Sequence, residues 1–216
     1  MMITNKKVIS LFVGFGVVAL IAGAVTWTLY SVYVLRSDGK VIRAIAKGFP
    51  AARVGSQTIP YGRFLEVRDT MRVYLASDAA KAAGGSVTSL TPDLEKNIVD
   101  RLERDAAMKQ HADARHAVVT DDQIHEAFTE LLAHTSSSES DINKYLADNY
   151  HWTKSDFEQN VIRPSLLETE LAKTYPASST DDSFAAFDAA ITDRLKQPDV
   201  KIYLRFPDAT GAAPTP

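Results

Sequence analysis

The chain has 216 residues, of which 45% are hydrophobic and 24% are charged, an ordinary balance for a protein with one sizeable core or two small ones. A formal net charge of -3, without a basic stripe, argues against a nucleic-acid partner. The chain contains no cysteine, which excludes disulfides, thiolate metal sites and cysteine nucleophiles.

An uncharged stretch runs from Val8 to Leu35. A helix rises about 1.5 Å per residue, so this stretch is longer than the roughly 30 Å hydrocarbon core of a bilayer. Trp27, Tyr30 and Tyr33 cluster at its far end, as expected of rings at headgroup level. We therefore predict that residues 1–36 are a cytoplasmic flank and a single-pass transmembrane helix, retained as a signal anchor. Cleavage within "IAGAVT" remains an alternative.

The sidedness of this anchor is less clearly specified than the span itself. Lys6 and Lys7 favour a cytoplasmic N-terminus, whereas the basic residues after the span, beginning with Arg36, favour the opposite orientation. A short N-terminal flank is usually retained in the cytoplasm, which favours an extracytoplasmic location for the rest of the chain. Gly14, Gly16 and Gly23 could also mark a helix-dimer face, so a homodimer stays open.

Two short β-prone runs, Ala52–Val54 and Gln57–Ile59, follow a basic juxtamembrane linker at residues 37–50. The linker is either a helical turn whose lysines contact anionic headgroups or a solvated spacer. Gly55-Ser56 separates the two runs, and glycine at the first central position is typical of a type II′ hairpin turn.

Helical periodicity then continues for over a hundred residues. A first helix starts at Pro60-Tyr61 and is expected to end at Gly84-Gly85. Later helices are marked by their N-caps: Thr91 before Pro92, the capping box at Thr120, the polar break at 135–141, and Thr153. Pro164 is expected to kink the helix that Thr153 begins, and a last helix precedes Pro198.

The segment "PDVKIYLRF" (198–206) alternates apolar and polar residues, which predicts a half-buried strand with Val200, Ile202, Leu204 and Phe206 on one face. The only other β-prone segment after the membrane run is the hairpin, so this strand should pair with it. The expected fold is mainly α: a transmembrane helix, then a helical domain over residues 51–206 with a small antiparallel sheet. We expect residues 207–216, rich in proline, glycine and alanine, to be disordered.

This arrangement resembles the N-terminal chaperone domain of SurA, PpiD and PrsA-type extracytoplasmic folding factors. The resemblance covers residues 50–206 and depends on "VGSQTI", "LEKNIVDRLERDAAMKQHA", "AVVTDDQIHEAF", "YLADNYHWTKSDFEQNVIRPSLLETEL" and the final helix and strand. In that family a parvulin isomerase domain usually precedes the final helix, but here only Pro176 to Thr180 occupies the place. The resemblance therefore implies a polypeptide-binding domain without isomerase activity.

The five histidines do not show the spacing of a metal site. Asp121, His125 and Glu126 are the nearest approach to one, but no H-E-x-x-H pattern occurs, and Asp121 has an alternative role at a helix start. No phosphate-binding loop and no nucleophile elbow are present. We expect no catalytic residue, no metal and no cofactor.

The candidate polypeptide-binding residues are aromatic and thioether side chains, which tolerate many partners. They are Tyr145, Tyr150, Trp152, Met71 and Met108. The alternative is that they are core residues, and for Phe157, Phe128 and Leu102 the core is the favoured interpretation.

The sequence thus predicts a membrane-anchored extracytoplasmic holdase for unfolded or newly translocated polypeptides in the cell envelope. The alternative is a non-catalytic membrane scaffold that docks one specific envelope partner. An enzyme with an unrecognised site ranks last.

Overall fold

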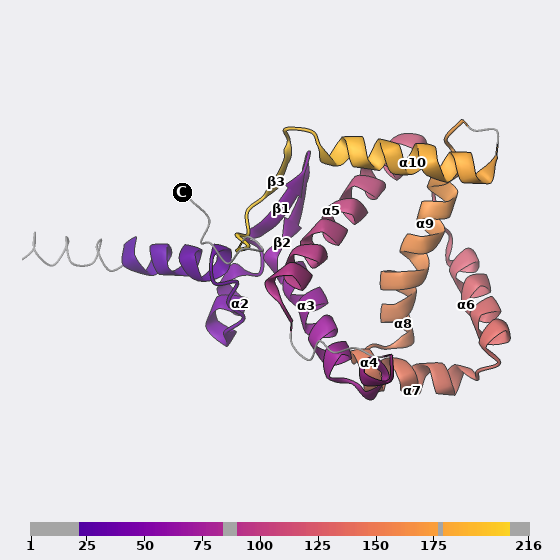
Figure 1. Cartoon of the computed structure of the whole chain (residues 1–216), viewed down its shortest axis with the longest axis horizontal. Helices are drawn as coiled ribbons and strands as arrows, with labels where there is room; N and C mark the ends of the chain where they lie inside the picture. The colour runs from indigo at the N-terminus through magenta and orange to yellow at the C-terminus, as the bar shows by residue number, and fades with distance from the viewer. Residues whose placement is uncertain (1–21, 84–89, 177–178, 208–216) are drawn as a thin grey trace, which may run out of the picture.

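A computed structural model describes residues 22–83, 90–176 and 179–207 of the chain. It is mainly helical, with one small sheet (Figure 1). Residues 22–33 form an N-terminal helix. The elements that follow are α2 (Lys40–Ala46), β1 (Pro50–Val54), β2 (Gln57–Pro60), α3 (Tyr61–Ala76), α4 (Asp78–Ala82), α5 (Pro92–Arg115), α6 (Asp121–Thr135), α7 (Glu139–Tyr150), α8 (Lys154–Phe157), a π-helical segment (Glu158–Ile162), α9 (Arg163–Ala172), α10 (Thr180–Leu195) and β3 (Val200–Ile202).

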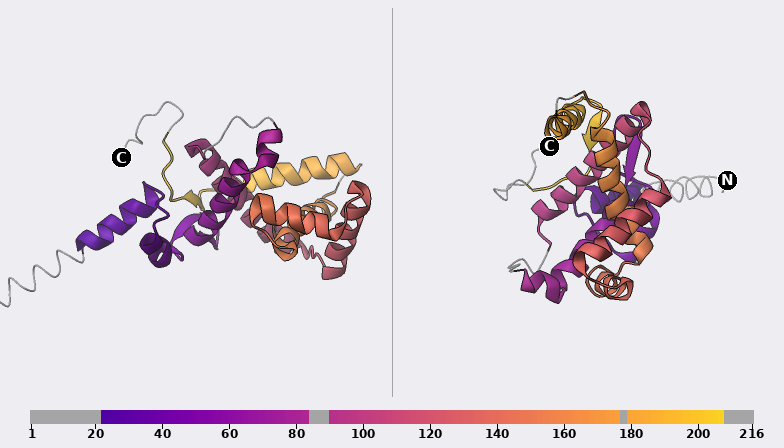
Figure 2. Two further views of the ribbon diagram at one scale, coloured as in Figure 1. Left: turned by 90° about the horizontal axis from the view of Figure 1, so that it is seen from below. Right: turned by 90° about the vertical axis from the view of Figure 1, so that its right-hand side faces the viewer.

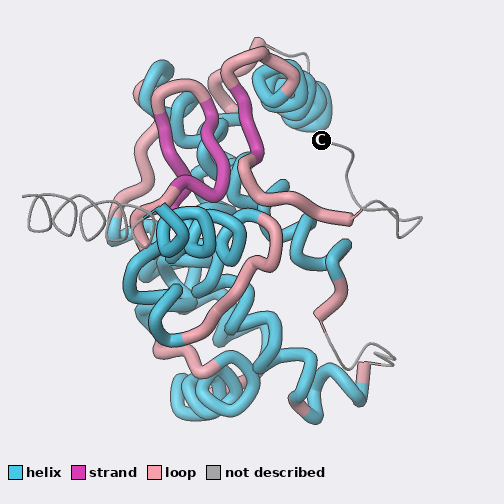
Figure 3. The backbone as a smooth tube through the Cα atoms, turned by 90° about the vertical axis from the view of Figure 1, so that its left-hand side faces the viewer, coloured by secondary structure: helices cyan, strands magenta, loops and turns pink. Residues whose placement is uncertain are grey.

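The sheet joins the two ends of the described domain, as the sequence predicts. Its strand order is β2-β1-β3, and both pairs are antiparallel. Ala52 pairs with Ile59 in β2 and with Ile202 in β3. Figure 3 shows the three strands side by side, with the yellow C-terminal strand of Figure 1 next to the N-terminal hairpin.

The last strand is shorter than predicted and its alternation is imperfect. Ladder pairing ends at Ile202, whose side chain is 40% exposed rather than buried. Leu204 is buried as expected. The N–H of Tyr203 still donates to Ala51 O of β1 at 3.0 Å, and the N–H of Arg205 then donates to Tyr33 O at 2.8 Å. The C-terminal segment therefore ends against the N-terminal helix.

Gly55 closes the hairpin between β1 and β2 with φ +56°, the positive value that its turn position requires. A Cβ at Gly55 would collide with the Arg194 guanidinium and lie 3.2 Å from Asp199 Oδ2. The turn is therefore constrained both by its conformation and by the ion pair that covers it.

Replacing Gly55 with alanine is expected to lower the free energy of unfolding by about 1 to 2 kcal/mol, because the backbone is strained and the ion pair must move. Thermal unfolding of the full chain in detergent micelles measures the loss. Gly48→Ala is the matched control, since nothing lies within 4 Å of its built Cβ. A loss no larger than the control's would show that the turn adapts at no cost.

Side-chain caps fix most helix starts where the sequence predicts them. Thr91 accepts from the N–H of Leu94, and complete capping boxes occur at Thr120, Ser138 and Thr153. Each cap satisfies backbone donors that have no partner within the helix. Three of these starts, at Thr91, Ser138 and Thr153, begin helices that contribute residues to the groove described below.

The first long helix ends earlier than we predicted. It stops at Ala76, where Ser77 turns to extended backbone and caps the short helix α4 by accepting from the N–H of Ala80 at 3.2 Å. The predicted end at Gly84-Gly85 is therefore wrong for this helix, and both glycines lie outside the described residues.

A π-helical segment, Glu158–Ile162, lies one turn before Pro164, where we predicted a kink, and only Arg163 separates it from the proline. Proline cannot donate to the carbonyl one turn earlier, so the helix must readjust around it. α8, this segment and α9 form one continuous helical run.

Two hydrophobic clusters form the core. The larger cluster unites the N-terminal helix, the sheet, α3, α5, α9 and α10, and includes Val32, Phe64, Val99 and Phe187. The smaller one, with Val119, Ile124, Phe128 and Ile162, packs α6 against the α8–α9 run. Leu102 and Phe128 are core residues as expected, and Phe157 is a half-buried member of the smaller cluster.

Residues 37–50, the expected linker, contain α2 and pack against the domain. Ala46 is fully buried in the larger core cluster, as is Val32 just before this segment. Residues 8–21 of the predicted membrane span lie outside the described residues, as does the whole tail from residue 208. Within 22–83, 90–176 and 179–207, no helix has the length and apolar character that crossing a bilayer requires.

Candidate functional site

A groove of about 680 Å³ lies among α3, α5, the end of α7 and the α8 run. α3 contributes Val67, Met71 and Tyr74 to its wall, and the α7–α8 junction contributes Tyr150 and Trp152. Figure 1 shows α3 and α5 extending from the sheet towards α7 and α8, which lie farther from the N-terminal helix. A groove of this size has room for several side chains of an extended peptide.

A stack of three aromatic rings forms the floor of the groove. The rings of Tyr74 and Tyr150 lie 5.2 Å apart and 5° from parallel, and those of Tyr150 and Trp152 lie 5.3 Å apart. All three side chains are half-buried. The stack joins α3 to the α7–α8 junction and leaves apolar ring surface within the groove.

The end of α7 explains how Tyr150 and Trp152 come to stack on each other. His151, between them, adopts the left-handed conformation with φ 55°, and its N–H donates to Ala147 O at 3.2 Å. This turn brings Trp152 back over Tyr150, and the Trp152 indole N–H donates to Thr70 Oγ1 at 3.2 Å. The indole is thus fixed at its polar edge and stacked on Tyr150, and it lines the groove.

The five predicted residues divide into three sets. Met71, Tyr150 and Trp152 line the groove together. Tyr145 is 47% exposed and meets the edge of Tyr150 at 6.1 Å, so it extends the aromatic surface without lining the groove. Met108 does neither: it is 4% exposed in the larger core cluster, and we withdraw it from the candidate set.

The groove is also lined by polar residues, among them Arg63, Asp105 and Asn160. Arg63 donates to Asn160 Oδ1 at 2.5 Å and pairs with Glu66 at 3.3 Å. Asp105, half-buried on α5, lies near Arg63 and Arg101 but accepts no hydrogen bond from the residues that the structure describes. The groove therefore offers both apolar faces and a carboxylate that still has hydrogen-bonding capacity.

Burial shifts the pKa of groove residues in a consistent direction. It raises the pKa of Tyr150 to about 12, with the neighbouring Tyr145 adding to the effect. Burial also raises the pKa of the Asp105 carboxyl, against the arginines around it. Asp156 is different, because its bond from the Thr153 hydroxyl lowers its pKa and commits it to the helix cap.

Sequence reasoning missed Tyr74, Arg63 and Asp105. Tyr74 falls on the apolar stripe of α3 and reads as a core residue, and its partner Tyr150 comes from a distant helix. The sequence around Arg63 and Asp105 indicates only charged positions on the solvent-exposed side of a helix. No local pattern indicates that a charged residue will face a groove, so only the packing of α3, α5 and α8 places them there.

No group of three or more histidine, cysteine, aspartate or glutamate side chains able to hold a metal ion occurs among the described residues. His111 contacts the Tyr175 hydroxyl through Nδ1 at 2.8 Å. His151 is the C-cap residue of α7. Asp121, which the sequence offered as part of an incomplete metal site, instead pairs with Arg163 at 2.7 Å.

The chain was compared with protein-family models, with curated proteins and with solved structures, and none of these comparisons produced a match.

Proposed function

We propose that this protein is a membrane-anchored, extracytoplasmic holdase that binds unfolded or newly translocated polypeptides without isomerase activity. The observation that carries this proposal is the half-buried aromatic stack of Tyr74, Tyr150 and Trp152 within a groove of about 680 Å³. The resemblance of residues 50–206 to SurA-type chaperone domains motivates the choice of ligand. The uncharged run from Val8 to Leu35 motivates the anchor.

The mechanism is reversible burial of apolar client side chains. Ring faces and the Met71 thioether accept side chains of many shapes, because neither requires a fixed hydrogen-bond pattern. Asp105 and the arginines that line the groove supply hydrogen bonds to an extended backbone. Burial of this kind needs no nucleotide and no covalent step, and the anchor raises the local concentration near the membrane.

The groove is preorganised, which lowers the entropic cost of binding. Tyr150 is held on both sides by rings, and the Trp152 indole is fixed by Thr70. Tyr145, on the rim, is free to contact a longer client segment because it is 47% exposed.

The test is suppression of aggregation. The full chain in lipid nanodiscs should prevent several unrelated unfolded proteins from aggregating at near-stoichiometric amounts. The full chain is needed because Val32 and Arg36 contribute to the folded domain, so a fragment starting at residue 37 would lose core contacts. A prolyl isomerisation assay should read background.

Replacing Tyr150 and Trp152 with alanine is expected to weaken client binding by about tenfold, since truncating central aromatic residues typically costs 1 to 2 kcal/mol or more. The matched control is Tyr33→Ala with Tyr203→Ala, a second aromatic pair, 6.4 Å apart beside the sheet. Circular dichroism checks that both variants are folded.

Unchanged client affinity in the folded Tyr150 and Trp152 double variant would contradict the proposed binding face. Capture of one stoichiometric partner, without any suppression of aggregation, would instead favour the membrane scaffold. A robust isomerisation rate would overturn the non-catalytic proposal.

A further inference from the structure

Helix α2 presents an apolar face to solvent. Val41 is 69% exposed and Ile45, one turn later, is 55% exposed. Ala44 lies exposed beside them, and Ala46 is the one fully buried residue of the helix. Two large aliphatic side chains on the same face of a short helix are poorly placed for solvent alone.

Basic residues stand at both ends of this face. Lys40 and Lys47 are exposed and form no ion pair with any residue in the described ranges. Arg43 is different, because its guanidinium pairs with Asp69 of α3 at 2.7 Å and is held against the domain. The outward side of α2 is therefore aliphatic at its centre and cationic at its ends.

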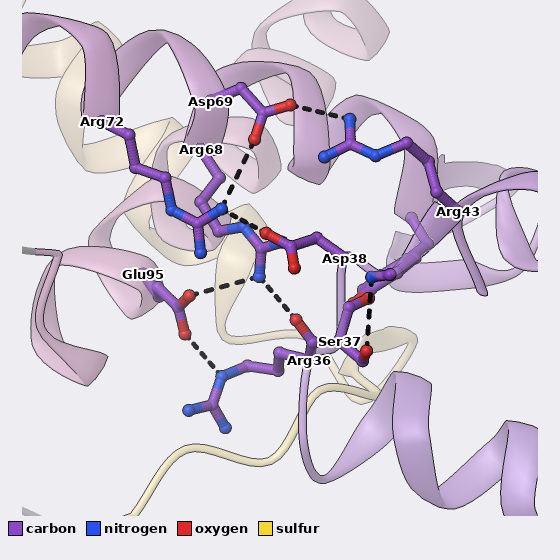
Figure 4. Close-up of polar contacts among 10 residues, drawn as sticks. Arg36, Ser37, Asp38, Arg43, Arg68, Asp69, Arg72 and Glu95 are labelled. Carbon is purple, nitrogen blue, oxygen red and sulfur yellow. Dashed lines mark hydrogen bonds and ion pairs between the residues drawn. The ribbon is translucent and has the colours of Figure 1, made fainter. Parts of the chain in front are cut away.

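The helix is pinned at both ends. Before it, the Tyr61 hydroxyl donates to Ser37 O at 2.8 Å and Asp38 pairs with Arg68 at 3.0 Å. After it, the N–H of Gly62 donates to Lys47 O at 2.9 Å, and a Cβ at Gly62 would meet that oxygen at 3.0 Å. Figure 4 shows the contacts of Asp38 and Arg43 with α3. The exposed face thus has a fixed orientation.

α2 also lies beside the end of the apolar N-terminal helix. Figure 1 shows it next to that end and running across the direction of helix 22–33, and the left view of Figure 2 agrees. In this region Trp27 is 62% exposed, Tyr30 48% and Leu35 50%. A helix that crosses the end of a membrane span lies in the plane of the interface.

We infer that α2 is a membrane-surface element: Val41 and Ile45 insert among the acyl chains at the interface, and Lys40 and Lys47 bind anionic headgroups. The inference rests on the membrane anchor of the proposed function, but not on the binding of clients. The charge pattern favours an anionic bilayer over a protein partner, since two unpaired lysines flank an aliphatic centre.

The consequence is a fixed orientation of the client groove. The anchor, α2 and α3 are joined by ion pairs rather than by a flexible linker, and α3 forms one wall of the groove. With helix 22–33 and α2 both engaged, the domain stands on the membrane at one angle. The same contacts orient the groove, because Asp69, which lines it, pairs with Arg43 of α2.

Single-cysteine probes test this inference, because the chain has no native cysteine. An environment-sensitive fluorophore is placed at Ala44→Cys on α2, at Val25→Cys in the N-terminal helix and at Ser140→Cys on the distant helix α7. The full chain is reconstituted in phosphatidylcholine vesicles, with or without phosphatidylglycerol, containing nitroxide-labelled lipid. The α2 probe is expected to be quenched at least about twofold more than the α7 probe, and more so with phosphatidylglycerol.

Two double variants and one single control variant sharpen the result. Val41→Asp with Ile45→Asp should abolish quenching at Ala44→Cys, whereas Val118→Asp, at an equally exposed valine between α5 and α6, should not. Lys40→Glu with Lys47→Glu should remove the effect of phosphatidylglycerol.

Quenching at residue 25 without quenching at residue 44 would overturn the inference and leave the anchor standing, with α2 then available to a protein partner. Quenching at neither position would overturn both the inference and the anchor. Aggregation suppression is measured separately, so failure of the holdase proposal would be distinguishable from either result.

Discussion

Replacing Arg68 with alanine is expected to lower the free energy of unfolding by about 3 to 5 kcal/mol, because it removes the central cation of a buried ion-pair network. The Arg68 side chain is 2% exposed and lies 3.0 Å from Asp38 and 3.4 Å from Glu95. It also donates to Arg36 O at 2.5 Å and lies over the Phe64 ring. Figure 4 shows it between Glu95 and Asp38.

Thermal unfolding of the full chain in non-ionic detergent measures this loss. Arg72→Ala is the matched control, because Arg72 also pairs with Asp38 but its side chain is 44% exposed, and an exposed pair contributes less than about 1 kcal/mol. Arg68→Met separates the lost pairing from the lost volume, since methionine fills much of the same space. If Arg68→Ala cost no more than Arg72→Ala, the network would contribute little to holding α2 and the N-terminal helix on the domain.

The architecture was largely predictable where short-range chemistry determines it. Helix starts at Thr91, Thr120 and Thr153 were found because a cap needs only its own residue and those that follow. The pairing of β3 with the hairpin was predicted by elimination, since no other β-prone segment was available. The break at Ser77 was missed because the alanine-rich sequence that follows it, DAAKAA at 78–83, favours continuation of the helix.

The candidate site was predictable only in part, because it combines elements far apart in the sequence. Tyr150 and Trp152 stood out as aromatics at a helix junction, but their partner Tyr74 comes from α3. Met108 was misplaced because α5 is surrounded by the sheet and by other helices, so a thioether there faces the core. The ion-pair network gave no local signal, since Arg36, Arg68 and Glu95 come from three separate segments.

Glu103 is a second buried charge, and it has no such partner. It is 6% exposed on α5, and its Oε1 accepts no hydrogen bond from the described residues. Burial, and then the nearby Asp100, raise the pKa of its carboxyl from 4.5 to about 7. The folded protein therefore holds a proton that the unfolded chain releases over this range, so the contribution of Glu103 to stability is greatest below pH 4.5 and is lost as the pH rises to about 7.

Replacing Glu103 with glutamine is expected to raise the free energy of unfolding by about 1 to 3 kcal/mol at about pH 8, and to change it little at about pH 4, where the native carboxyl is already protonated. Glutamine keeps the shape of the side chain and removes the charge that burial disfavours. Thermal unfolding across this pH range tests the effect, with Glu130→Gln on the exposed face of α6 as the control. A variant that is less stable than the native protein at pH 8 would show that the Glu103 carboxylate is favourably bound in the folded state. A stabilising effect would instead show that the buried Glu103 carboxyl lowers the stability of the native protein at this pH. α5 carries this acid although it packs against the sheet and lines the groove.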